Sequence, residues 1–186
     1  MIIWLASYPK SGNTWVRALI SHYLYSKDEE FDFNLLLHIP KFIQEKYISP
    51  VTNIHELKRD SLKISELWES AQARINLDNE INFFKTHNAC ASYKERWFTD
   101  EKNTLAYIYI VRDPRSIVVS LASHLSISLN DATDLILNEN HIGYNGPYRL
   151  AEITASWKIN YLSWKKRKNF DGIIVRYEDL IDDAEN

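Results

Sequence analysis

The sequence has little of several residues whose abundance would define a class of protein. Cys90 is the only cysteine among 186 residues, so no internal disulfide can form, which is typical of a reducing compartment. The longest apolar stretch, residues 105–111, is far too short to span a bilayer. The N-terminus lacks the basic segment and cleavage site of a signal peptide. We therefore expect a cytoplasmic protein with no membrane span.

An excess of positive charge is also missing. Lysine and arginine number 22 against 25 acidic residues, for a net charge of -3, which argues against a nucleic-acid-binding protein. Any site for an anion must therefore be local. The length suits one domain with its own core, and a content of 45% hydrophobic and 25% charged residues is ordinary for a globular protein. We predict a single domain spanning residues 1–186.

Alternating strand and helix patterns predict an α/β sandwich around a mainly parallel sheet. Buried strands are indicated by apolar or β-branched runs at residues 2–6, 81–86, 104–111 and 172–176. Helices are indicated at residues 14–25, from Asp113-Pro114 to about residue 124, and along a stripe from Leu150 to Trp164. Residues 28–80 fit this alternation less well, although residues 64–75 have a helical pattern. We interpret them as a cover over the sheet edge or the site.

The segment Tyr-Pro-Lys-Ser-Gly-Asn-Thr-Trp joins the first predicted strand to the first helix, at residues 8–15. Backbone N–H groups of such a loop and the following helix N-terminus point at an incoming anion. Gly12 permits close backbone approach, and the loop adds two hydroxyls and the charge of Lys10. A Walker A loop would have lysine directly after the glycine, where this sequence has Asn13. A phosphate loop and a plain connecting turn both stay open.

A second candidate anion site follows the strand at residues 104–111. Arg112 lies at its carboxyl end, which is where ligands bind in parallel α/β sheets. The planar fork of arginine donates two parallel hydrogen bonds to a phosphate. Ser120 lies two helical turns further on and is placed to face the same anion. The alternative is that Arg112 pairs with Asp113 or another carboxylate.

Four segments resemble the PAPS-dependent sulfotransferases, in that family's order, between residues 3 and 180. YPKSGNTW resembles the 5'-phosphosulfate loop, RDPRSIVVS the 3'-phosphate motif, and FFKTH the strand that ends in a catalytic histidine. A long helix with two tryptophans, followed by VRYEDL, resembles the next elements. The resemblance implies a P-loop-type three-layer sandwich with about four to five strands. It also implies a C-terminally short domain, because the family continues past YEDL with a basic glycine-containing loop.

The resemblance implies a role for each matching residue. The co-substrate is 3'-phosphoadenosine 5'-phosphosulfate (PAPS), the product is adenosine 3',5'-bisphosphate (PAP), and no metal is needed. The residues implied for the 5'-phosphate are Lys10, Ser11, Gly12, Asn13 and Thr14, with Lys10 also at the bridging oxygen. Those implied for the 3'-phosphate are Arg112 and Ser120, and those for the adenine are Trp15 and Tyr177.

The chemistry of the FFKTH segment agrees with this resemblance. Lys85 and His87 share a face if the strand stays regular. A neutral imidazole is the natural base for an acceptor hydroxyl, while Lys85 and Lys10 would stabilise the negative charge of the transfer. The hypothesis is in-line sulfuryl transfer to the hydroxyl (or amine) of a small molecule, with His87 as base. A packed or capping His87, a P-loop small-molecule kinase and a nucleotide-binding protein without turnover are the alternatives.

Overall fold

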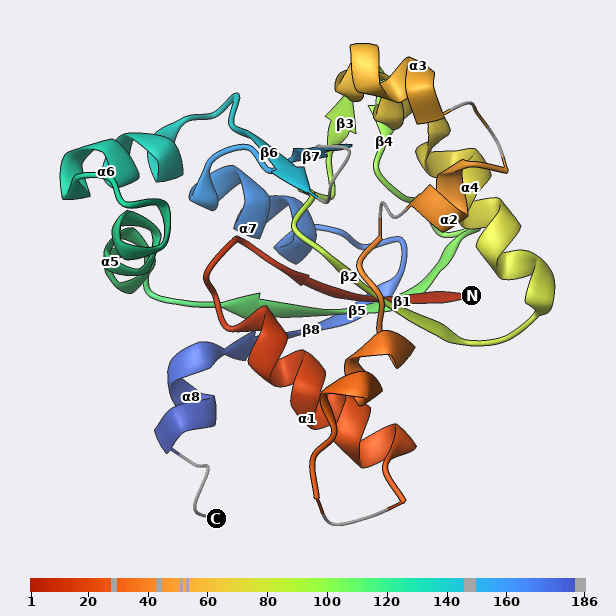
Figure 1. Cartoon of the computed structure of the whole chain (residues 1–186), viewed down its shortest axis with the longest axis horizontal. Helices are drawn as coiled ribbons and strands as arrows, with labels where there is room; N and C mark the ends of the chain where they lie inside the picture. Colours follow the sequence, from red (N-terminus) through yellow and green to blue (C-terminus); the bar gives the residue numbers. More distant parts are fainter. Residues whose placement is uncertain (28–29, 43–44, 51, 53, 146–149, 183–186) are drawn as a thin grey trace.

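The computed structural model describes residues 1–27, 30–42, 45–50, 52, 54–145 and 150–182. Its centre is a parallel sheet of four strands in the order β2-β1-β5-β8 (Figure 1). The strands are β1 (Ile2–Ser7), β2 (Asn82–Thr86), β5 (Thr104–Val111) and β8 (Asp171–Arg176). Each coincides with a predicted strand to within one residue. Because the strands are parallel, their carboxyl ends meet at one edge of the sheet.

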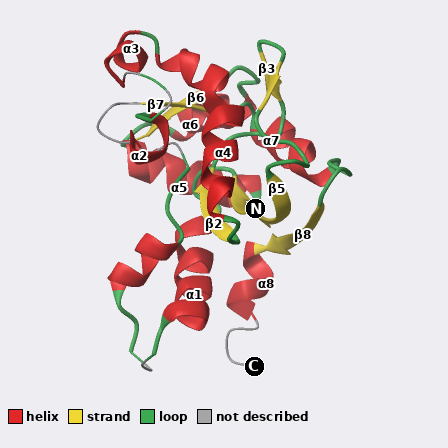
Figure 2. Cartoon of the chain, turned by 90° about the vertical axis from the view of Figure 1, so that its right-hand side faces the viewer, coloured by secondary structure: helices red, strands yellow, loops and turns green. Residues whose placement is uncertain are grey.

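Helices cover both faces of this sheet and complete the predicted three-layer α/β sandwich (Figures 1 and 2). On one face lie α1 (Asn13–Tyr25), the 3₁₀ helix η1 (Phe33–His38) and α8 (Tyr177–Asp182). The other helices are α2 (Glu45–Ile48), α3 (Ile54–Arg59), η2 (Ser61–Leu67), α4 (Trp68–Ile75), η3 (Asn76–Asp78), α5 (Pro114–Leu125), α6 (Leu129–Leu137) and α7 (Trp157–Lys165). Two short hairpins are β3 (Ser92–Tyr93) with β4 (Arg96–Trp97), and β6 (Ile142–Asn145) with β7 (Leu150–Ile153). No helix in the described ranges is long and apolar enough to cross a membrane.

Side chains that alternate along the strands build a core on each face of the sheet. Trp4 and Phe84 face α4 and α7, where they join a cluster that includes Trp68 and Trp164. Leu5 in β1 faces the opposite way, into a second cluster beneath α1. The odd-numbered side chains of β1 and β2 therefore point toward α1. Lys85 is one of them, so it leaves β2 on the α1 side of the sheet.

Part of the cover region adds to the sheet edge. The segment 40–42 pairs with the outer side of β2, since Lys85 N donates to Pro40 O at 2.9 Å and Phe42 N donates to Lys85 O at 2.8 Å. Lys41 and Lys85 are thereby partners in a parallel bridge. This pairing satisfies backbone groups that an edge strand otherwise exposes.

The prediction for residues 150–164 is wrong in its first part. Leu150–Ile153 is strand β7, and Ala155, with a φ of 56°, breaks the chain before α7 begins. Ser156 caps that helix by accepting a hydrogen bond from Ile159 N at 3.3 Å. The partner of β7 is β6, at residues 142–145, and residues 146–149 lie outside the described residues.

The start of α5 is confirmed as predicted. The helix begins at Pro114, and the carboxylate of Asp113 accepts a hydrogen bond from Arg115 N at 2.8 Å. This cap fixes where β5 ends and therefore where Arg112 projects.

Candidate functional site

The loop between β1 and α1 needs glycine for two independent reasons. Gly12 has a φ of 89°, which L side chains rarely adopt, and a β-carbon there would lie 2.3 Å from the ring of Tyr177. Lys10 also has a positive φ, of 68°. The hydroxyl of Ser11 is buried and has no hydrogen-bond partner among the described residues. A buried hydroxyl of this kind is costly unless it meets a ligand or water.

Asn13 connects the start of α1 to β1. Its Nδ2 donates to Leu5 O and to Ser7 Oγ, both at 3.0 Å. The side chain is buried, so its NH₂ group is used within the fold.

The two predicted anion sites lie side by side, because β1 and β5 are neighbours in the sheet. Arg112 Nη1 donates to Lys10 O at 2.9 Å, and its guanidinium lies over the ring of Tyr177, 4.3 Å from the centroid. Tyr177 in turn meets Trp15 edge-to-face, with ring centroids 5.9 Å apart. One cluster therefore contains Lys10 of the loop, Arg112 of the second predicted anion site, and the two aromatic residues predicted for the adenine.

In the structure, Asp113 is not the partner of Arg112. Asp113 pairs with Arg115, at 2.5 Å, and hydrogen bonds from Arg115 lower the pKa of Asp113 to about 2. The backbone N–H of Asp113 donates to Glu178 Oε1 at 2.9 Å.

His87 lies directly after β2, beside the loop. Its Nδ1 is 2.7 Å from Ser7 O and 3.3 Å from Ser7 Oγ, while its Nε2 is 2.7 Å from Lys85 Nζ. Because a carbonyl oxygen only accepts, the neutral ring carries its proton on Nδ1 and presents the Nε2 lone pair to Lys85. The last residue of β1, the imidazole and the lysine are thus hydrogen-bonded in one chain.

Burial sets the protonation of this pair. Burial first, and then the charge of Lys85, hold the pKa of His87 well below its usual value, so the ring is neutral at pH 7. Lys85 is 5% exposed, and burial lowers its pKa to about 8. Glu152 opposes that lowering, whereas Lys41 and Arg17 add to it. Lys85 is therefore mostly charged at pH 7.

Residues that the sequence patterns did not single out hold His87 in place. Asn160 is fully buried, and its Nδ2 donates to His87 O at 2.9 Å and Thr154 O at 2.8 Å. Its Oδ1 accepts from Tyr109 OH at 2.8 Å. The sequence did contain a signal for Asn160, because it is a polar residue on the buried face of α7. Ser7, which accepts from His87, had no such signal.

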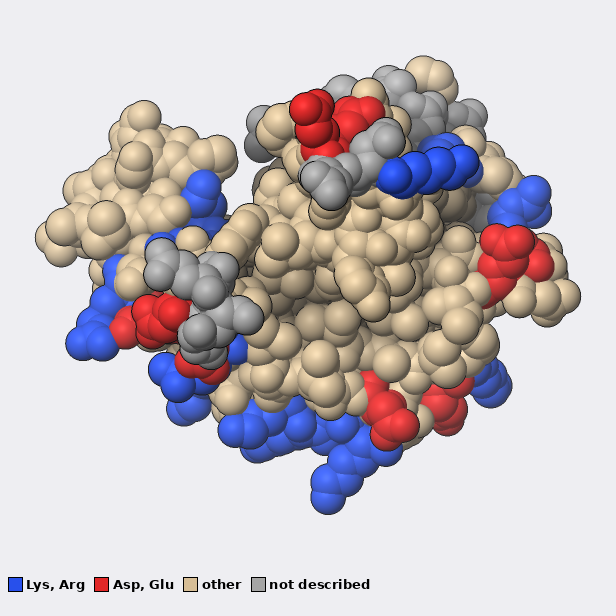
Figure 3. All heavy atoms as spheres, turned by 90° about the horizontal axis from the view of Figure 1, so that it is seen from below, with Lys and Arg blue, Asp and Glu red and all other residues tan. Residues whose placement is uncertain are grey.

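Two predicted residues lie apart from this cluster. Thr14 is exposed, and in the described part of the chain no hydrogen bond joins Ser120 to Arg112 or to the loop. A groove of about 800 Å³ opens beside Arg112 and is lined by basic and aromatic side chains that include Arg176, Lys165 and Trp157. Seen from below, charged side chains of both signs lie around the rim, whereas the middle of the face that carries α1 is uncharged (Figure 3).

A parallel sheet, a glycine loop between its first strand and helix, and an arginine at the end of the neighbouring strand are features of the P-loop type of α/β fold. The family model described as the sulfotransferase domain matches residues 2–186. The chain belongs to this family.

Solved structures with the same fold include a sulfotransferase and a retinol dehydratase. Mouse sulfotransferase SULT7A1 complexed with PAP is 18% identical, with a TM-score of 0.53, over 98% of this chain and 53% of that one. Retinol dehydratase with androsterone and PAP is 17% identical, with a TM-score of 0.54, over 98% and 56%. Its complex with retinol and PAP is 19% identical, with a TM-score of 0.53 over the same shares. The chain thus spans little more than half the length of these proteins. A search of the curated proteins found no match.

Proposed function

We propose that this chain is a cytoplasmic PAPS-dependent sulfotransferase that acts on the hydroxyl (or amine) of a small molecule. The observation that carries the proposal is a pair of contact sets at neighbouring strand ends. Arg112 is bonded to Lys10 of the loop, and a second set runs from Asn13 through Ser7 and His87 to Lys85. The predicted anion sites, a neutral imidazole and a charged lysine thus lie at one edge of the sheet. The single cysteine is the reason for the cytoplasmic assignment.

The residues fit the nucleotide well. Lys10, Lys85 and Arg112 supply positive charge, and the loop supplies backbone N–H groups and the unpaired hydroxyl of Ser11. We assign the loop residues 10–14 to the 5'-phosphate end, and Arg112 with Ser120 to the 3'-phosphate. Trp15 and Tyr177 are assigned to the adenine. PAPS supplies the sulfuryl group when it is bound.

His87 Nε2 is the proposed proton acceptor. The Nδ1 proton is held by Ser7 O at 2.7 Å, so Nε2 is the ring nitrogen that carries the lone pair. As the acceptor oxygen bonds to sulfur and the bond from sulfur to the phosphate oxygen breaks, the hydroxyl proton passes to Nε2. A base of this kind typically contributes about 10²- to 10⁴-fold to the rate.

Lys85 has to change partners for this chemistry. In the structure its ammonium occupies the lone pair of His87 Nε2, at 2.7 Å. An anion beside the loop attracts that ammonium, and the movement leaves Nε2 open to an acceptor hydroxyl. Lys85 and Lys10 then stabilise the charge that develops on the donor side. Nucleotide binding and base availability are therefore coupled.

Turnover of labelled PAPS with a panel of phenol, sterol, sugar and amine acceptors tests the proposal. Calorimetric titration with PAP and with AMP tests the two anion sites separately. The retinol dehydratase structure, which holds androsterone and PAP, makes a sterol a sensible member of the panel. Tight PAP binding without turnover on any acceptor would favour a nucleotide-binding protein. Preference for ATP with magnesium would favour the kinase alternative, which the absence of a lysine after Gly12 makes the weaker one.

A further inference from the structure

Lys41 brings a positive charge to the outer side of the proposed catalytic pair. It belongs to residues 40–42, the edge segment, and is the partner of Lys85 in a parallel bridge. Neighbouring strands lie about 4.8 Å apart, and bridge partners leave the sheet on the same face. Lys41 is therefore beside Lys85, whose Nζ is 2.7 Å from His87 Nε2. Lys85 is buried whereas Lys41 is partly exposed, so Lys41 is the lysine that meets solvent.

The strand order separates Lys41 from the two proposed anion sites. From the edge inwards, the sheet has the edge segment, then β2 with His87 after it, then β1 with the loop, and then β5 with Arg112. The loop and Arg112 therefore lie on one side of His87, and Lys41 lies on the other. In an in-line displacement the attacking oxygen is opposite the leaving oxygen, so the acceptor approaches from the side away from the loop. Lys41 is on that side.

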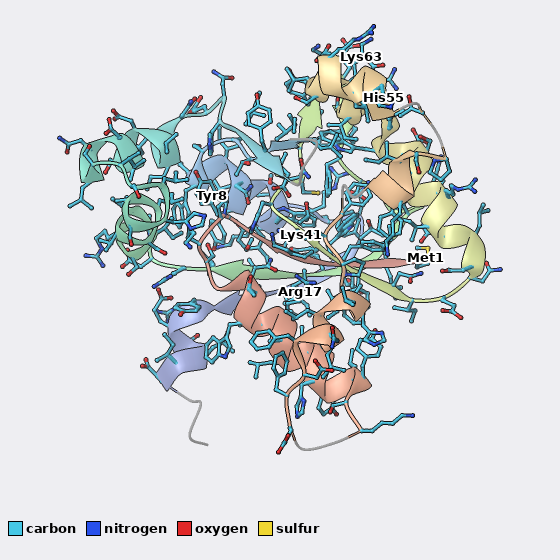
Figure 4. The ribbon with its side chains drawn as sticks, viewed as in Figure 1. Met1, Tyr8, Arg17, Lys41, His55 and Lys63 are labelled. Atoms are coloured by element: carbon cyan, nitrogen blue, oxygen red, sulfur yellow. The ribbon has the colours of Figure 1, made fainter. Side chains whose placement is uncertain are left out.

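A second cation comes from α1, which covers this face of the sheet. The guanidinium of Arg17 donates to Leu36 O, and its Nε is buried without a partner in the described part of the chain. Because η1 leads directly into the edge segment, this bond holds the segment against α1. In Figure 4 Arg17 and Lys41 both lie between Tyr8 and Met1. A buried N–H without a partner is costly, and an anion beside it would supply the acceptor.

The charges at this position agree with the geometry. Burial lowers the pKa of Lys85 to about 8, and the charges of Lys41 and Arg17 lower it further, whereas Glu152 opposes them. Burial raises the pKa of Glu152 itself, toward the uncharged carboxyl. Even as a carboxylate, Glu152 is outnumbered by the three cations. The side of His87 away from the loop is therefore positively charged, and it attracts an anion.

We propose that the acceptor carries an anionic group besides its reacting hydroxyl, and that Lys41 binds this group. The role of the hydroxyl rests on the function proposed above, whereas the anion site does not. Lys41 is one strand away from Lys85, and His87 is two residues further on, so the anionic group and the hydroxyl are separated by roughly 5–8 Å. One aromatic or sugar ring spans this distance. A ring with a hydroxyl on one side and a carboxylate, phosphate or sulfate on the other has the required chemistry.

Two acceptors of the same shape test the proposal, 4-(hydroxymethyl)benzoate and its neutral amide, 4-(hydroxymethyl)benzamide. In the parent we expect kcat/KM for the benzoate to exceed that for the amide by about 10-fold, the effect of one charge-assisted hydrogen bond. Lys41→Gln should lose this preference, and Lys41→Arg, which keeps the charge, should retain it. Lys63→Gln removes the same charge from an exposed position of η2 and is the matched control, which keeps the preference.

Binding of the same two compounds to the ligand-free chain, followed by NMR titration, gives a readout that needs no turnover. We expect the benzoate to bind about 10-fold more tightly than the amide, and Lys41→Gln to remove the difference. The proposal is overturned if the parent binds both compounds alike or binds neither. A benzoate preference of full size in Lys41→Gln also overturns it. Should Lys41→Gln fail to fold by circular dichroism, the comparison of the two compounds on the parent and on Lys41→Arg still decides.

The two readouts separate this inference from the proposed function. If the benzoate binds through Lys41 but no acceptor is turned over with labelled PAPS, the proposed function is wrong and the anion site stands. If PAPS is turned over and the amide serves as well as the benzoate, the inference is wrong and the proposed function stands. If the benzoate does not bind and PAPS is not turned over, both are wrong.

Discussion

Arg112 and Lys10, which are 102 positions apart in the sequence, are joined by a hydrogen bond of 2.9 Å from the guanidinium to the loop carbonyl. The arginine thereby fixes the loop before any nucleotide arrives. It also keeps further N–H donors, since a guanidinium carries five and this bond uses one. The residue proposed for the 3'-phosphate is thus bonded directly to the loop proposed for the 5'-phosphate.

Replacing Arg112 with alanine should weaken PAP binding by about 1.5–3 kcal/mol, which corresponds to about 10- to 160-fold in affinity. The reason is the loss of a charge-assisted contact to the 3'-phosphate. AMP, which lacks that phosphate, should lose less. Calorimetry with both nucleotides measures the difference. The exposed Arg74→Ala removes the same charge from α4 and should leave both affinities unchanged. Equal losses for PAP and AMP in Arg112→Ala would restrict its role to fixing the loop.

Gly12→Ala should impair PAP binding and lower the melting temperature. The left-handed conformation costs a residue with a β-carbon about 1–2 kcal/mol, and that carbon would lie 2.3 Å from the Tyr177 ring. The loop or Tyr177 has to move, and both belong to the proposed nucleotide site. Gly143→Ala is the matched control, since its nearest contact would be Thr154 Oγ1 at 3.2 Å and its φ is not in the positive range. Normal PAP affinity in Gly12→Ala would argue against a phosphate at this loop.

The sequence allowed the frame of this site to be predicted. Apolar runs located all four strands of the sheet, and Asp113-Pro114 located the start of α5, because both are local signals. The approach of Arg112 to the loop follows from the parallel order of β1 and β5. Its bond to a loop carbonyl does not, because it depends on side-chain geometry.

The features that could not be predicted from the sequence depend on contacts between segments that are far apart in the chain. Leu150 and Ile153 continue the helical stripe of α7, so their β7 conformation depends on pairing with β6. The burial of Glu152 could not be predicted from the sequence, because it follows from that hairpin. The position of Lys41 could not be predicted either, because it depends on the pairing of residues 40–42 with β2.

The bond between Lys85 and His87 should open when PAP binds. The ammonium is attracted to the added phosphates, so Nε2 loses its donor while Nδ1 keeps its bond to Ser7 O. Long-range ¹H–¹⁵N correlation spectra report both nitrogens. We expect a neutral Nδ1–H ring throughout, with a shift of the Nε2 resonance on PAP addition. Lys85→Met, which lacks the donor, should show the shifted Nε2 position without PAP. An Nε2–H ring in the parent would contradict the assignment of Nε2 as base.

His87→Ala should abolish turnover and leave PAP affinity nearly intact, because the imidazole acts on the acceptor side. Labelled-PAPS turnover and calorimetry on the same preparation measure the two effects. His124→Ala changes an exposed histidine at the end of α5 and should alter neither. Full turnover in His87→Ala, with an acceptor that the parent uses well, would remove His87 from the reaction.

The low pKa of His87 also predicts an acid sensitivity of the fold. Burial holds the folded-state pKa well below the usual 6.5, so the unfolded chain binds a proton that the native protein does not. The free energy of unfolding contributed by this residue is therefore unaffected above about pH 6.5 and falls as the pH drops below it. His87→Gln removes the titrating group, so its melting temperature should decline less than the parent's between pH 7.5 and pH 5. The exposed His124→Gln should decline as the parent does. All other carboxylates and histidines are common to the proteins compared, so the difference between the two slopes isolates His87. A His87→Gln profile parallel to the parent's would mean that the imidazole titrates normally in the folded state, and that its neutrality at pH 7 owes nothing to burial.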